Sequence, residues 1–182
     1  MHWSPPAISS FKLNFYGAAK GNLGPTGYGG VIRNDRGIVQ HIFYGSIGKD
    51  TNNVAEMEGL WKGICIADQH SFHPLEVEGD SLILINVATR IQVGTSVAKI
   101  ASSWRLLSRL EILEERLRHP NCIIFKHVKH SANQVADRLA NQGVDLHRPP
   151  YSGTLNDSED IQLQKECHSL EIQDIQSPAA GD

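Results

Sequence analysis

Long apolar runs and a disulfide framework are both missing from this chain of 182 residues. No stretch approaches the roughly 18 consecutive apolar residues that a membrane helix requires, and the opening segment MHWSPPAISS has no apolar core of signal-peptide length. The three cysteines are odd in number and far apart, which favours neither a set of disulfides nor a paired zinc site. We therefore expect an intracellular protein, nuclear or cytoplasmic, that is neither secreted nor bound in a membrane.

The charge is divided unevenly along the chain. The net charge is -3, but from Val144 onward eight acids face only two bases, so the tail is about -6 and residues 1–143 are about +3. The tail is also poor in aromatic and β-branched residues, a composition typical of disorder. We predict a lead-in at 1–10, one domain at 11–143 and an acidic disordered tail at 144–182, with a transient helix near 161–175. The tail is a candidate contact for a protein partner, and we expect a monomer.

Residue periodicity predicts a mixed α/β domain. Apolar residues alternate with polar ones along Phe11 to Phe15, the pattern of a half-buried strand, and Tyr16 falls on the face opposite Phe15. The same reasoning gives strands at 12–18, 28–34, 38–47, 74–80 and 122–128, and helices at 53–69, 81–90, 96–117 and 132–142. This order favours a five-stranded mixed sheet, beginning with an antiparallel meander, with helices packed on it.

Three acidic residues lie at the boundaries of these predicted elements. Glu56 is in the first turn of a helix, Asp80 ends a strand, and Asp137 lies in the last helix. Each position has an ordinary structural explanation, such as helix capping or a solvated helix face. Strand ends and helix starts converge in α/β sheets, however, and carboxylates are the ligands that Mg²⁺ prefers. Together the three acids are candidate metal ligands.

Four sequence segments, in order, resemble the ribonuclease H family: YGAAKGNLGPTGYGG, TNNVAEMEGLWKGICIA, LEVEGDSLILIN and HVKHSANQVADRLAN. The resemblance covers about residues 11–143 and is closest to the ribonuclease H-like domains of plant non-LTR retroelement reverse transcriptases. It implies a ribonuclease H-like fold and cleavage of the RNA strand of an RNA-DNA hybrid. It also implies two Mg²⁺ or Mn²⁺ ions held by four carboxylates.

The resemblance places Glu56, Asp80 and Asp137 at three of those carboxylates and Tyr16 at the fourth, where the family has a metal-bridging aspartate. A tyrosine phenol has a reference pKa of about 10 and is neutral near pH 7, and its ring fills the space of a metal and its waters. We therefore expect impaired cleavage and weakened metal binding. His130 falls near a family histidine that assists proton movement or product release, but the match is loose, and an ordinary exposed histidine is the alternative.

Substrate contacts are expected at positions other than the metal ligands. Asn22, Asn52 and Asn53 match family positions that reach the minor groove of the hybrid, and Gly17 would let the nucleic acid approach the backbone. Turn formation and helix capping explain the same residues locally. Two functional hypotheses follow: a hybrid-binding ribonuclease H-like protein with an incomplete metal site, or a retroelement-derived protein-interaction module without nuclease activity. A remnant without a selected function is a third reading.

Overall fold

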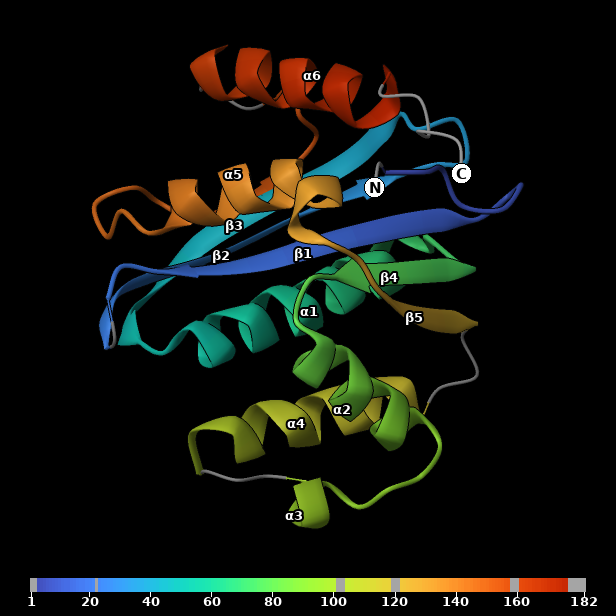
Figure 1. Ribbon diagram of the computed structural model, residues 1–182, viewed down its shortest axis with the longest axis vertical. Helices are drawn as coiled ribbons and strands as arrows, with labels where there is room; N and C mark the ends of the chain where they lie inside the picture. The colour runs from blue at the N-terminus through green and yellow to red at the C-terminus, as the bar shows by residue number, and fades with distance from the viewer. Residues whose placement is uncertain (1–2, 22, 101–103, 119–121, 158–160, 177–182) are drawn as a thin grey trace.

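The computed structural model describes residues 3–21, 23–100, 104–118, 122–157 and 161–176, and Figure 1 shows their arrangement. The strands are β1 (Phe11–Ala19), β2 (Gly24–Arg33), β3 (Val39–Asp50), β4 (Leu75–Gly79), β5 (Ile123–His127) and β6 (Tyr151–Gly153). The helices are α1 (Asn52–His70), α2 (Leu82–Gln92), α3 (Val97–Ile100), α4 (Trp104–Leu117), the 3₁₀ helix η1 (His130–Ala132), α5 (Gln134–Gly143) and α6 (Ile161–Gln176).

The strands form one mixed sheet in the order β5-β4-β1-β2-β3-β6. β1, β2 and β3 pair antiparallel, as the meander prediction required, whereas β4 joins β1 and β5 joins β4 in parallel. The α/β fold class is confirmed. The strand number differs from the predicted five, because β6 adds an antiparallel sixth strand to β3.

Helices cover both faces of the sheet (Figure 1). On one face α1, α2 and α4 enclose the main core, which includes Leu13 and Phe15 from β1 and Leu60 from α1. Thr51 caps α1 by accepting a hydrogen bond from the Val54 amide, and Ser81 caps α2 in the same way through the amide of Leu84. These caps start each helix directly after a strand, so Glu56 and Asp80 lie near the same edge of the core.

The opposite face is covered by α5 and α6, which corrects the prediction of a disordered tail. Leu155, Leu163 and Cys167 are 4%, 0% and 1% exposed, and they pack in a second cluster with α5, β2 and β3. Few apolar residues suffice here because α5 and the sheet already supply most of the apolar surface. The segment after Gly143 therefore continues the fold through β6 and α6.

Other boundaries differ less from the predictions. The helix expected at 96–117 is divided into α3 and α4, with residues 101–103 outside the described part, and the last helix begins at Gln134 after the short η1. Cys65 and Cys167 are buried, whereas Cys122 is exposed at the start of β5. Across the described residues, every helix is too short or too polar to cross a bilayer.

Candidate nucleic-acid site

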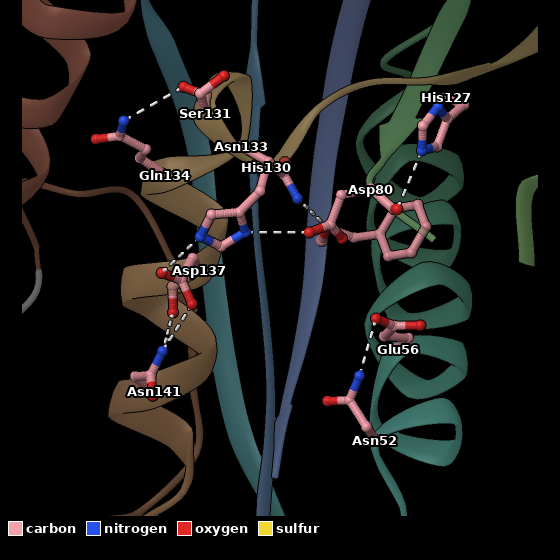
Figure 2. A network of polar contacts seen from close by, with 11 residues as sticks. Asn52, Glu56, Asp80, His127, His130, Ser131, Asn133, Gln134, Asp137 and Asn141 are labelled. Carbon is pink, nitrogen blue, oxygen red and sulfur yellow. Dashed lines mark hydrogen bonds and ion pairs between the residues drawn. The ribbon is translucent and has the colours of Figure 1, made fainter. Parts of the chain in front are cut away.

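Four elements bring the predicted site residues together on one side of the molecule. Tyr16 comes from β1, Glu56 from α1, Asp80 from the end of β4, and Asp137 from α5. Figure 2 shows Asp137 and Asp80 on either side of His130, with Glu56 below Asp80 on α1. The structure therefore brings these residues together, from elements that lie far apart in the sequence.

His130 lies between the two aspartates. Its Nδ1 is 3.1 Å from Asp80 Oδ2, and its Nε2 is 3.7 Å from Asp137 Oδ2. The Tyr16 ring lies tilted against the imidazole, with 5.5 Å between ring centroids. The histidine side chain is 56% exposed, so it lies on the solvent side of the site. The imidazole thus occupies the space between the two acids that β4 and α5 contribute.

Tyr16 has all three carboxylates as electrostatic neighbours. Burial, followed by the charges of Asp137, Asp80 and Glu56, raises the pKa of Tyr16 to about 12. The phenol is therefore neutral at neutral pH and offers a weak ligand oxygen to a cation. Burial also raises the pKa of Asp137, against the opposing charge of His130, and the nearby Asp80 raises it further.

Glu56 is the most enclosed acid of the group, with 7% of its surface exposed. Burial raises its pKa to about 7, while hydrogen bonds from Ser81 and Asn52 favour the charged form. The Asn52 amide donates to Glu56 Oε1 at 3.1 Å. Glu56 thus faces the start of its own helix and the cap of α2, where burial favours its protonated form.

This donor set does not fit the two-metal centre that the family resemblance implies. Among the described residues, no group of three or more His, Cys, Asp or Glu side chains is arranged to hold a metal ion. A neutral phenol stands where the resemblance implies a bridging aspartate, and the Asp80 carboxylate contacts His130. A Mg²⁺ pair needs several charged oxygens on a shared point. The chain supplies three acids around a tyrosine instead.

The predicted substrate contacts have mixed outcomes. Asn52 and Asn53 are exposed at the start of α1, next to Glu56, while Asn22 lies outside the described residues. A Cβ atom on Gly17 would come within 2.2 Å of the Glu56 backbone nitrogen. Glycine at this position is therefore required for α1 to pack against β1, whether or not nucleic acid also approaches it.

Sequence reasoning missed Asn133. Its side chain is 1% exposed, and its Nδ2 donates to the Phe15 carbonyl of β1 at 2.8 Å. Because Asn133 lies between η1 and α5, this bond fixes His130 and Asp137 to the strand that carries Tyr16. The only sequence signal is the position of an asparagine immediately before a predicted helix, which is equally typical of a simple cap.

Comparison with known proteins identifies the family and the fold. The reverse transcriptase-like family matches residues 14–143. An Arabidopsis thaliana protein named for ribonuclease H is 29% identical over 144 residues, covering 79% of this chain and 22% of that protein. The ribonuclease H1 of the archaeon Halobacterium salinarum has a TM-score of 0.63 at 27% identity, covering 75% of this chain and 98% of that chain. The LC11 ribonuclease H1, solved in complex with an RNA/DNA hybrid, has a TM-score of 0.56 at 26% identity, covering 75% of this chain and 97% of that chain.

The family match and the fold define a ribonuclease H-like protein, as the sequence resemblance predicted. The chain belongs to the reverse transcriptase-like family, within the wider group of ribonuclease H proteins. It spans about a fifth of the length of its Arabidopsis relative.

Proposed function

We propose that this protein binds nucleic acid, with an RNA-DNA hybrid as the preferred class, and that its capacity to cleave the hybrid is impaired. The observation that carries the proposal is the position of Tyr16 among Glu56, Asp80 and Asp137, all three of which act on its pKa. A site that held two metal ions would need a charged oxygen at this point. Any affinity for Mg²⁺ or Mn²⁺ is correspondingly weakened.

Binding can outlast the loss of cleavage, because contacts to a hybrid come mainly from groups other than metal ligands. Amide side chains that reach 2′-hydroxyls and backbone phosphates supply such contacts in RNA recognition. Asn52 and Asn53 are exposed beside the site and are available for this role. A hybrid complex of a relative with the same fold supports the choice of substrate class.

The alternative function is a protein-interaction module without nuclease activity. The packing of α6 on α5 favours a structural role for the tail, but Ile161 and Lys165 of α6 are exposed and could contact a partner. The two functions differ in one measurable respect, because only the first requires selective binding of nucleic acid.

Fluorescence anisotropy with a labelled RNA-DNA hybrid, DNA duplex and single-stranded RNA of equal length tests the proposal. We expect the hybrid to bind most tightly, with an affinity that falls as salt rises, because phosphate contacts release counterions. Incubation of the same hybrid with Mg²⁺ or Mn²⁺ should yield little cleavage. Equal and negligible binding of all three nucleic acids would favour the protein-interaction module, and efficient cleavage would contradict the role assigned to Tyr16.

A further inference from the structure

A row of buried polar side chains runs along β1 and β4 toward the candidate site. Lys12 and Asn14 on β1 pair in parallel register with Glu76 and Glu78 on β4. Because strand side chains alternate between faces, the next positions on the same face are Tyr16 on β1 and Asp80 after β4. The row therefore begins beneath the N-terminal segment and ends at the candidate site.

The side chains in this row are charged or polar, and three of them are almost completely enclosed. Lys12 and Asn14 are each 1% exposed and Glu78 is 4% exposed. Lys12 Nζ lies 2.6 Å from Glu78 Oε1 and 3.4 Å from Glu76 Oε2. Asn14 Nδ2 donates to Glu78 Oε2 at 3.1 Å. Each strand is thus bound to the other by side chains as well as by backbone hydrogen bonds.

Buried ion pairs of this kind are poor stabilisers, because the desolvation of both charges offsets much of their attraction. Their best-attested use is to select one alignment of two elements over others. Alignment matters here because a one-residue slip of a strand turns each of its side chains to the other face. A slip of β4 would turn Asp80 away from His130, whose Nδ1 it contacts at 3.1 Å.

The N-terminal segment seals this row from water. Trp3 is 4% exposed, and its Nε1 donates to Asn14 Oδ1 at 2.9 Å. The guanidinium of Arg33 lies 4.6 Å from the centre of the Trp3 ring, and Lys12 Nζ lies 5.5 Å from it. Lys12 Nζ also donates to the Ser4 carbonyl at 2.7 Å. Trp3 therefore completes the hydrogen bonding of the row and lowers the local dielectric around it.

We propose that Trp3, Lys12, Asn14 and Glu78, called here the register lock, hold β1 and β4 in the alignment that turns Asp80 toward His130. Trp3 is then a positioning residue of the candidate site, although it lies outside the family match at residues 14–143. The lead-in is accordingly part of the working domain. Only the binding measurement in the test below rests on the proposed function.

The test uses the full-length chain carrying Trp3→Ala, Trp3→Phe or Leu163→Ala. Leu163 is 0% exposed in the second cluster, so Leu163→Ala is a matched control that destabilises the protein away from the lock. The readouts are the thermal midpoint, the imidazole NMR resonances of His130 at one fixed pH, and hybrid affinity. The His130 resonances are assigned from the spectrum of His130→Gln.

We expect Trp3→Ala to shift the His130 resonances and to weaken hybrid binding about tenfold, less than the roughly 100-fold that a misplacement of about 1 Å can cost a reaction. Trp3→Phe retains a ring beside Arg33 and should recover part of both effects. Leu163→Ala should lower the thermal midpoint without moving the His130 resonances.

The lock is overturned if Trp3→Ala lowers the midpoint as Leu163→Ala does but leaves the His130 resonances unchanged. The lead-in would then be a structural cover only. If the wild type binds no hybrid, the proposed function fails, but the His130 resonances still decide whether the lock acts on the site.

Discussion

Tyr16 is the residue at which the candidate site departs from the four carboxylates that the family resemblance implies. Its neighbours Glu56, Asp80 and Asp137 all raise its pKa, which places the phenol within electrostatic reach of each acid. In a cluster of four carboxylates without metal, mutual repulsion would destabilise the fold. A neutral tyrosine relieves that repulsion while it removes the charged oxygen that a bridging position requires. Stability and metal affinity are therefore opposed at this residue.

Substitution of Tyr16 by aspartate should raise metal affinity and lower stability. We expect Tyr16→Asp to create or greatly raise Mg²⁺-dependent cleavage of a hybrid, and to lower the free energy of unfolding without metal by about 1 kcal/mol, since it adds a like charge. Metal at about 100 times its Kd should restore about 2.7 kcal/mol. Gel assays of cleavage and urea unfolding with and without Mg²⁺ measure the two effects.

Tyr16→Phe is the matched control, because it keeps the ring and adds no charge. It should neither cleave nor respond to Mg²⁺. Wild-type protein that cleaves as well as Tyr16→Asp, with Asp80→Asn abolishing both activities, would contradict the view that Tyr16 impairs the site. If both proteins bind hybrid and neither cleaves it, the remaining residues also depart from a working metal centre.

Glu56 makes stability depend on pH. Its pKa is raised from the ordinary value of 4.5 to about 7, mainly by burial, so the folded state holds the proton more tightly than the unfolded chain does. The resulting stabilisation is complete below about pH 4.5 and is lost as pH rises through about 7.

Glu56→Gln removes this titration. Relative to wild type, its free energy of unfolding should be nearly equal at about pH 4.5 and greater by about 2 to 3 kcal/mol at about pH 8. Urea unfolding of both proteins across this range gives the difference, in which all other titrations common to the two proteins cancel. A difference that stays constant with pH would mean that Glu56 titrates normally in the folded protein.

At the scale of elements, the alternation of apolar and polar residues predicts a strand or helix correctly where each of its faces has one kind of neighbour. The alternation of Leu13 and Phe15 with polar residues predicted β1 and its core face correctly. The same alternation predicts that the opposite face of β1 is exposed to solvent. Lys12 lies on that face but is only 1% exposed. Its partners, Glu78 and Trp3, come from segments that the sequence gives no reason to place together. Their convergence depends on the fold as a whole.

The acidic tail is the clearest case in which composition misled. Its apolar residues are too few to form a core of their own, so disorder was the reasonable prediction. Leu163 and Cys167 nevertheless lie on one side of α6, four positions apart, and fill the space beside α5. The apolar surface that receives them belongs to β2, β3 and α5. The composition of the tail alone therefore cannot predict that it packs on this apolar surface.

This packing predicts different outcomes for two neighbouring residues of α6. Leu163→Ala should lower the free energy of unfolding by about 2 to 4 kcal/mol, since it leaves a cavity in the second cluster. Ile161, two residues earlier, is 65% exposed, so Ile161→Ala should change stability by less than about 0.5 kcal/mol. Chemical denaturation of the two variants measures both values. If the two substitutions change stability equally and only slightly, α6 is not firmly packed against the domain.

At the scale of the whole molecule, the tail has two opposing effects: its negative charge should weaken nucleic-acid binding, whereas its packing stabilises the fold. The tail carries about -6 and residues 1–143 about +3, so the tail charge can compete with phosphates for the basic part of the chain. The same segment covers Val31, Ile42 and Leu139 of the second cluster. Arg138 of α5 also pairs with Glu166 of α6, which holds one tail charge in place. Removing the tail therefore has two effects at once: it removes charges that compete with phosphates, and it exposes the second cluster to solvent.

The buried side chains of the tail contribute more to stability than its exposed charges do. The loss of Leu155, Leu163 and Cys167 removes several buried side chains worth about 1.5 to 3 kcal/mol each, whereas exposed charges contribute far less at physiological salt. Deletion of 144–182 should therefore lower the thermal midpoint by about 10 °C or more and promote association through the uncovered surface. Calorimetry and size-exclusion chromatography of the truncated and full-length chains measure these effects.

Salt separates the two causes. Screening at about 0.5 M NaCl weakens the electrostatic effect of the tail in the full-length chain, but it cannot replace the missing helix in the truncated chain. The difference in midpoint should therefore persist at high salt, while any difference in hybrid affinity at low salt should shrink. A truncated chain with an unchanged midpoint at both salt concentrations would show that α6 contributes no cover. Tighter hybrid binding by such a chain at low salt would leave charge as the only effect of the tail.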